Sequence, residues 1–250
     1  MLHLLLLLLL VPPLFRLAVA FFNPKSLKSA ESRSVRAMLE GHFGRPTTDP
    51  LVSEIGHKLM EGARLKARFF IIEGPMLNAV TLPDGDILLW RGLLGRVREH
   101  PDRLAGVLAH ELGHLKREHY IGRIYWLALL QFVFGIFARP FVFFFMRQIV
   151  YRILAYGFSR VSEHQADDTA VDLMLQAGFD PNGLASLFDD LARVTEPMGM
   201  LGTHPDPRNR ADRVRQKIAR LGLTSELPSK RKILDFPDAV DRSSNPLKAD

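Results

Sequence analysis

The sequence contains no cysteine, so disulfide bonds and thiolate metal ligands are both excluded. It also shows no RNP motif, zinc finger or helix-turn-helix pattern, which are signatures of nucleic-acid binding. The charge balance is nevertheless basic, with a net charge of +6 and a pI near 9.8. Because the arginines alternate with apolar stretches, we expect the membrane lipid surface as a partner, and no nucleic acid.

The N-terminal segment has no lysine or arginine ahead of its leucine run, Leu4–Leu10. Its apolar core is also shorter than the roughly 20 residues that a spanning helix needs. Ala18-Val19-Ala20 has the small-x-small form of a signal-peptidase site. We therefore expect a cleaved signal peptide or, alternatively, a membrane anchor over residues 1–22, and export of the rest of the chain.

A chain of 250 residues that is 47% hydrophobic can bury one good core. Scattered polar residues, with Gly41, Gly44, Pro46 and Pro50, predict a linker at 23–50 that contains a short helix at 29–39. A polar composition predicts a mobile tail at 222–250. Between them we expect one folded domain, at 51–221.

His110, Glu111 and His114 form a His-Glu-x-x-His pattern in an apolar-periodic run that predicts a helix, capped at its start by Asp102. Residues four apart lie on one face of a helix, so both imidazoles can bind one metal ion while Glu111 stands beside it as general base. This is the arrangement of a zinc hydrolase. Such a site needs about three protein ligands and an open position for water, so a third ligand must come from elsewhere.

The same helix does not supply the third ligand. Glu118 lies a further turn along the axis, too far for bonds of about 2 Å, and His119 is out of register with the ligand face. The metzincin pattern is therefore disfavoured. Glu163 and Asp167 lie one turn apart on a second predicted helix, 159–177. Glu163 can then bind the metal, while Asp167 accepts a hydrogen bond from a ligand histidine.

Three short segments ahead of the zinc helix have strand propensity, at 67–72, 79–82 and 87–90. They predict a small antiparallel sheet, whose exposed edge can accept an extended peptide as one more strand. Helical spacing elsewhere completes an α+β domain that is mostly helical.

These motifs together resemble the gluzincin peptidases of family M48. The resemblance covers about residues 78–210 and rests on HELGH at 110–114, SRVSEHQAD at 159–167, Asn-Ala-Val at 78–80, and Thr-His-Pro at 203–205 followed by Arg210. It implies a zincin-like metallopeptidase fold, one zinc ion per chain and endopeptidase activity. It further implies that Asn78, Ala79 and Val80 bind substrate. His204 would lie over the zinc, where it either hydrogen-bonds the oxyanion or occupies the open coordination position, and Arg210 would help to hold it.

The insertion between the two ligand segments, 121–158, is apolar and contains no acidic residue. Because His114 and Glu163 must meet at one ion, the insertion leaves and returns on the same side of any membrane, which excludes a single spanning helix. Its arginines would each cost at least about 2.5 kcal/mol at bilayer depth unless they reach the surface. We therefore expect a hydrophobic helical hairpin lying in one leaflet, ahead of a two-helix span or a buried hairpin in a soluble protein.

The expected function is that of an exported zinc endopeptidase, associated with the membrane on the periplasmic side of the cell envelope. Extended polypeptides are the expected substrates, from unfolded or misassembled envelope proteins, and the oligomeric state stays open. The alternative is a chaperone-like binding module with little turnover. A prenyl-protein protease is disfavoured, because it would need several more spanning helices.

Overall fold

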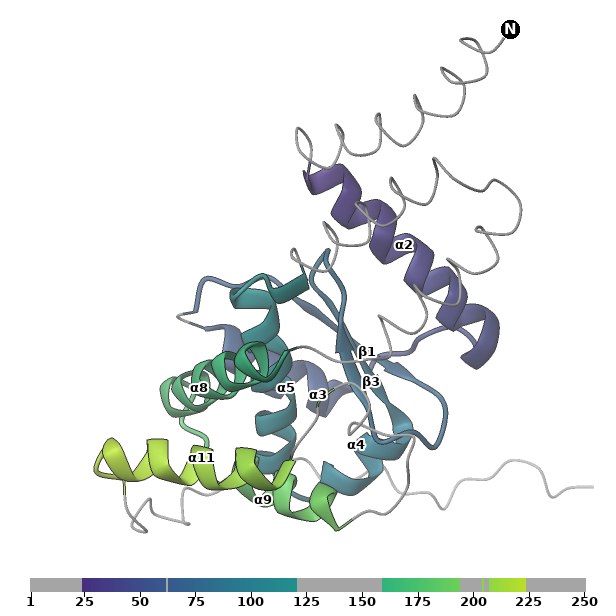
Figure 1. Ribbon diagram of the computed structural model, residues 1–250. Coiled ribbons are helices and arrows are strands. Elements are labelled where there is room, and N and C mark those ends of the chain that lie inside the picture. Colours follow the sequence, from purple (N-terminus) through teal and green to yellow (C-terminus); the bar gives the residue numbers. More distant parts are fainter. Residues whose placement is uncertain (1–23, 62, 121–158, 194–203, 205–206, 224–250) are drawn as a thin grey trace, which may run out of the picture.

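The computed structural model describes residues 24–61, 63–120, 159–193, 204 and 207–223 (Figure 1). In these ranges the chain forms, in order, α2 (Pro24–Phe43), α3 (Pro50–Met60), β1 (Arg68–Ile72), β2 (Ala79–Thr81), β3 (Asp86–Trp90), α4 (Arg91–Val97), α5 (Pro101–Lys116), α8 (Arg160–Gln176), α9 (Asn182–Ala192) and α11 (Pro207–Arg220). The predicted α+β, mostly helical fold class is confirmed.

Three predicted segments lie outside the described residues: the signal peptide or anchor at 1–22, the hydrophobic hairpin at 121–158, and the tail beyond 223. Among the helices that the structure does describe, none is both long and apolar enough to cross a bilayer.

The three strands form one mixed sheet in the order β1-β3-β2. β2 pairs with β3 antiparallel, with Ala79 opposite Leu89, and β1 pairs with β3 parallel, with Arg68 opposite Asp86. The sheet therefore differs from the predicted antiparallel one in one strand pair. The reason is that β3 lies between the other two strands and runs in the direction of β1.

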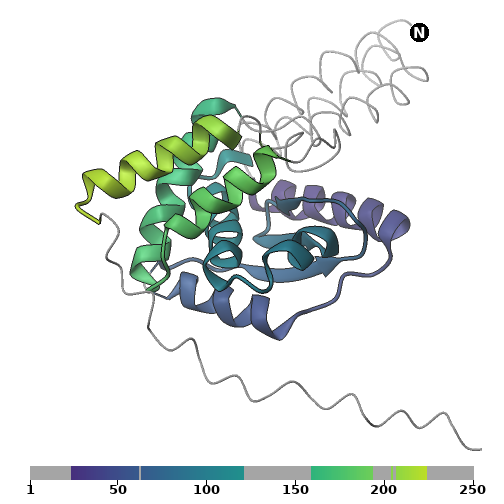
Figure 2. The same ribbon diagram turned by 90° about the horizontal axis from the view of Figure 1, so that it is seen from below.

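The sheet is covered on both faces, as Figures 1 and 2 show. Side chains of a strand alternate between faces. Ile87 and Leu89 of β3 therefore join the main core with α3, α5, α8, α9 and α11, while Leu88 and Trp90 join a smaller cluster with α2. Every residue of β3 is buried. The sheet thus separates α2 from the helices that carry the candidate site.

Helix α2 contains the short helix predicted at 29–39 and corrects the predicted linker over the rest of its length. Val35 is buried against the sheet, and Leu39 and Phe43 pack beside it. The glycine and proline signals of a linker apply only to the end of this stretch, where Gly44 adopts a φ of +80° after the last turn of α2. Most of this stretch is therefore part of the folded unit.

The start of α5 differs from the predicted cap at Asp102. Pro101 occupies the first turn and His100 is the N-cap, without a side-chain hydrogen bond to the helix. The Oδ1 of Asp102 instead accepts a hydrogen bond from the backbone N–H of Asp180, 2.9 Å away. Proline suits the first helical position because it has no N–H to satisfy. Asp102 therefore ties α5 to the chain that leads into α9.

Candidate metal centre

Both histidines of α5 point toward the same place from one face of the helix. The Nε2 atoms of His110 and His114 are 3.0 Å apart, and both side chains are buried. Gly113 allows α5 to lie directly against α8, since a Cβ at this position would come within 2.7 Å of the carbonyl oxygen of Ala166. The glycine between the histidines therefore brings them to the helix that carries Glu163.

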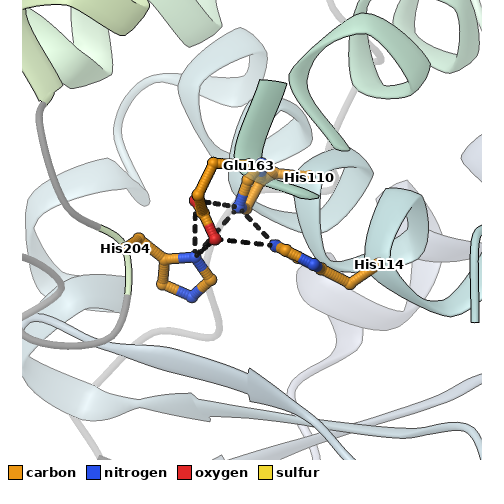
Figure 3. Close-up of side chains that lie close together, drawn as sticks. All are labelled: His110, His114, Glu163 and His204. Carbon is orange, nitrogen blue, oxygen red and sulfur yellow. Dashed lines mark hydrogen bonds and ion pairs between the residues drawn. The ribbon is translucent and has the colours of Figure 1, made fainter. Parts of the chain in front are cut away.

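Glu163 approaches both imidazoles from the first turn of α8, which is capped by the Ser159 hydroxyl (Figure 3). Its Oε1 lies 3.4 Å from the Nε2 of His114, and its Oε2 lies 3.5 Å from the Nε2 of His110. Tetrahedral zinc ligands with bonds of 2.0–2.1 Å stand about 3.3 Å apart. The three residues predicted as ligands are thus brought together at spacings that fit a zinc ion.

His204 completes a group of four buried residues with His110, His114 and Glu163, whose ligand atoms lie within 4.8 Å of one another. Its Nδ1 lies 3.1 Å from the Nε2 of His110 and 3.0 Å from the Oε2 of Glu163 (Figure 3). This nitrogen therefore stands where a fourth ligand would approach. The group could hold one metal ion.

Asp167 and Arg210 lie behind the ligands. The Oδ1 of Asp167 is 3.0 Å from the Nδ1 of His110, the ring nitrogen on the far side from the other ligands. Arg210 donates to both oxygens of Asp167, at 2.9 and 2.7 Å, and its Nη1 lies 2.8 Å from the Oε2 of Glu163. The guanidinium therefore links the carboxylate of the ligand to the carboxylate that orients His110.

The charges of this cluster shift its pKa values in opposite directions. Burial and the Arg210 cation lower the pKa of His110, but Asp167 and Glu163 outweigh them and raise it to about 9. Burial raises the pKa of Glu163, but His204 and His110 outweigh it and hold this pKa below its usual range. Burial, with His110 next to it, lowers the pKa of His114 well below its usual value. The carboxylate is therefore ionised, and only one of the two α5 histidines is strongly basic.

Glu111 faces β2, where the hydroxyl of Thr81 donates to its Oε2 over 2.7 Å. The other oxygen, Oε1, is buried and has no hydrogen-bond partner among the described residues, and it lies 3.5 Å from the Nε2 of His204. One carboxylate oxygen is thus held by the strand while the other faces the site. The sequence did not reveal Thr81, because its contact with Glu111 depends on how β2 packs against α5.

Asn78, Ala79 and Val80 lie at the edge strand, because no described strand pairs with the outer side of β2. Asn78 is buried, and its Oδ1 accepts a hydrogen bond from the N–H of Ala79 at 2.9 Å. The side chain of Ala79 joins the main core and that of Val80 the smaller cluster. Asn78 thus shapes the backbone of the edge strand through its carbonyl oxygen.

A helix bearing His110, Glu111 and His114, with Glu163 supplied by a second helix, defines a metallopeptidase centre of the gluzincin class. Comparison with known proteins agrees with this class. The chain belongs to Peptidase family M48, whose family model matches residues 46–218.

Several known proteases are similar to this chain. It is 31% identical over 146 residues to the mitochondrial metalloendopeptidase OMA1 of Arabidopsis thaliana, and this alignment covers 56% of this chain and 29% of that protein. It is 26% identical over 197 residues to the beta-barrel assembly-enhancing protease of Yersinia pestis, and this alignment covers 67% of this chain and 40% of that protein. It is 28% identical over 153 residues to the metalloprotease YcaL of Escherichia coli, and this alignment covers 57% of this chain and 59% of that protein. The match therefore spans less than two thirds of the length of each of these relatives.

Proposed function

We propose that this chain is an exported, membrane-associated zinc endopeptidase that cleaves unfolded or misassembled envelope proteins. The observation that carries this proposal is the convergence of His110, His114 and Glu163 beside Glu111, whose Oε1 accepts no hydrogen bond from the residues that the structure describes. This is the set of groups that zinc-dependent peptide hydrolysis requires.

The residues divide the chemistry between them. Zinc held by His110, His114 and Glu163 would polarise the scissile carbonyl and lower the pKa of the attacking water. Glu111 takes the proton of this water on Oε1 and passes it to the leaving amine. Thr81 holds Oε2 and so keeps the other oxygen directed at the site.

His204 acts as a removable fourth ligand in this proposal. Of the two roles implied by the family resemblance, occupation of the open position agrees better with its Nδ1, which lies among the ligand atoms. A peptide carbonyl needs the same place. His204 therefore has to move aside before cleavage.

The outer edge of β2 is the proposed substrate site. The N–H of Trp90 donates to the carbonyl of Asn78, and the N–H of Leu82 donates to the carbonyl of Asp86. Because antiparallel pairing alternates along a strand, Ala79 and Thr81 direct their backbone groups away from β3. An extended peptide that pairs with this edge would lie beside Glu111, which Thr81 contacts. Such pairing favours unfolded chains, because a compact protein offers no free strand.

The sequence supports the proposed location. The apolar segment at 1–22 suits export, and the basic, apolar insertion at 121–158 suits a membrane surface. One relative is named a beta-barrel assembly-enhancing protease, which supports envelope proteins as substrates. If the location is right, the protein stays in the membrane fraction of an envelope preparation after a high-salt wash. Release into the soluble fraction would contradict the inserted hairpin.

Replacement of Glu111 by glutamine tests the proposed activity. Glu111→Gln keeps the size of the side chain but removes the base, so casein cleavage should fall by at least about 100-fold while zinc content stays at one ion per chain. Glu99→Gln, at an exposed glutamate after α4, is the matched control and should keep full activity. Unchanged, chelator-insensitive cleavage by Glu111→Gln would remove the proposed mechanism. Binding of unfolded casein without turnover by the wild type would favour the chaperone-like module.

A further inference from the structure

His119 lies outside the ligand set, yet the structure places it against a ligand. The Nδ1 of His119 is 3.0 Å from the Nδ1 of His114, and the Nε2 of His119 is 3.0 Å from the Oε1 of Gln165. His119 leaves the end of α5, and Gln165 comes from the first turns of α8. A short chain of contacts therefore runs from the ligand to the second helix.

A break in the helix brings His119 into this position. If the helix continued without interruption, the side chain of His119, five residues after His114, would point about 140° around the helix axis from the side chain of His114. α5 ends at Lys116, and Glu118 adopts a φ of +52°, a left-handed conformation that is unfavourable for a residue with a Cβ. This turn ends the helical path of the chain. The backbone thus adopts an unfavourable conformation next to the residue that it delivers to His114, as often occurs at functional sites.

The hydrogen bonds of this chain are consistent with one arrangement of protons. The Nε2 of His114 faces His110 and Glu163, so binding a metal there leaves the proton of the ring on Nδ1. That N–H can donate to the Nδ1 of His119, and the N–H at Nε2 of His119 then donates to the carbonyl oxygen of Gln165. Gln165 thereby selects the form of His119 that accepts from His114.

We propose that His119, oriented by Gln165, is the positioning residue for the metal ligand His114. The inference rests on the proposed zinc site and assigns to His114 a partner equivalent to the one that Asp167 provides for His110. Such partners fix the ring orientation and tautomer of a ligand histidine. The two ligands differ in that one has an anionic partner and the other has a neutral ring.

Zinc affinity tests this inference directly. His119→Ala removes the acceptor and should weaken zinc binding about 10- to 100-fold, measured by competition with a chromophoric chelator on the full-length protein. His119→Asn keeps an acceptor near the position of Nδ1 and should restore most of this loss. Gln165→Leu removes only the group that orients His119 and should give a smaller loss. His164→Ala, at the neighbour of Glu163 in the sequence, is the control and should bind zinc like the wild type.

Two further readouts separate positioning from a general structural role. The melting temperature of the zinc-free protein should be similar in the wild type and in His119→Ala, while the rise in melting temperature on adding zinc should be smaller in the variant. The absorption bands of the cobalt-substituted protein should also shift in His119→Ala and return toward the wild-type spectrum in His119→Asn.

The inference would be overturned by wild-type zinc affinity in His119→Ala, or by equal losses in His119→Ala and His119→Asn. An equal drop in melting temperature with and without zinc would assign His119 a purely structural role instead. Failure of the proposed function would give a different result. If the wild type binds zinc through His110 and His114 but cleaves no substrate, the proposed peptidase activity is wrong, and the zinc affinities of the variants still test the role of His119.

Discussion

Gly113 lies against Ala166, and a Cβ on Gly113 would come within 2.7 Å of the carbonyl oxygen of Ala166. The two helices that carry the proposed ligands therefore touch through backbone atoms at the level of the metal centre. Gly113→Ala should force them apart, destabilise the protein by about 1–3 kcal/mol and weaken zinc binding.

Gly95 in α4 provides the control for that substitution, because a Cβ there would meet nothing within 4 Å. Gly95→Ala should leave zinc binding unchanged and stabilise the protein by about 0.5–1 kcal/mol, since alanine favours a helix more than glycine does. Denaturant unfolding of both variants measures the difference. Equal effects would show that Gly113 does not limit the approach of α5 to α8.

Arg210 is buried between Asp167 and Glu163, with its guanidinium carbon 4.1 Å from the centre of the Phe188 ring. Arg210→Met keeps much of the side-chain volume but removes one of the two cations, Arg210 and protonated His110, that face the buried carboxylates of Asp167 and Glu163. We expect a loss of about 3–5 kcal/mol in the free energy of unfolding of the zinc-free protein.

Arg213, one turn further along α11, forms a comparable ion pair with Asp168 at 2.9 Å, but its side chain is 43% exposed. Arg213→Met should therefore cost no more than about 1 kcal/mol. If both arginine variants unfold at the same denaturant concentration, the buried pair does not stabilise the metal centre.

Thr81 is expected to matter for turnover more than for folding. Thr81→Val removes the hydroxyl that donates to the Oε2 of Glu111 and keeps the shape of the side chain. Without this hydrogen bond the carboxylate of Glu111 is held less firmly. The value of kcat/KM on an unfolded protein substrate should therefore fall by about tenfold, which corresponds to a loss of about 1.4 kcal/mol in transition-state stabilisation. Thr81→Ser retains the hydroxyl and should retain most of the activity. Equal activity of the valine and serine variants would contradict a role for this hydrogen bond.

Zinc binding should release a proton from His110. In the zinc-free protein its pKa is raised to about 9, so the ring is protonated at pH 7, whereas a metal ligand has to be neutral. His114 is already neutral, because its pKa is lowered. Apparent zinc affinity should therefore rise with pH between 7 and about 9 and level off above that range. Calorimetry in buffers of different ionisation enthalpy measures the protons released, and a value of zero at pH 7 would contradict the prediction.

Removal of His204 should increase access to the metal. His204→Ala takes away the nitrogen that lies 3.1 Å from the Nε2 of His110, so cleavage of casein should increase while zinc affinity falls modestly. The alternative role, donation to the oxyanion, predicts a fall in kcat instead, by about 100-fold. Steady-state kinetics on zinc-saturated protein distinguishes the two roles.

Features that depend on local periodicity could be predicted from the sequence. The i, i+4 spacing of His110 and His114 fixes their common face, and the same spacing of Glu163 and Asp167 fixes theirs, so the geometry of a single helix was enough to group them. The left-handed turn at Glu118 has no such signature, because glutamate normally continues a helix. The prediction that His119 is not a ligand agrees with its place outside the ligand group, but its contact with the Nδ1 of His114 depends on this turn and could not be predicted.

Features that depend on packing between helices and strands could not be predicted from the sequence. Asp102 is a residue type typical of helix caps, but the observed N-cap is His100, two positions earlier, and Asp102 instead accepts a hydrogen bond from the N–H of Asp180. The order of the strands likewise reflects which apolar faces meet, and strand propensity does not contain that information. Residue type predicts only a short helix at 29–39 in this region, and the full length of α2 becomes apparent only where its apolar side chains pack against the sheet.

The turn at Glu118 sets how this chain can change in length over evolution. One residue gained or lost between His114 and His119 would swing the second ring away from the first, so this short spacing should stay constant among descendants. The restriction set by this turn does not extend to the number of residues between Tyr120 and Ser159. α5 and α8 already meet at Gly113, and each doubling of a loop's length adds only about 0.6 kcal/mol of closure entropy. Lineages can therefore lengthen, shorten or exchange the segment at this junction while the two ligand helices keep their places.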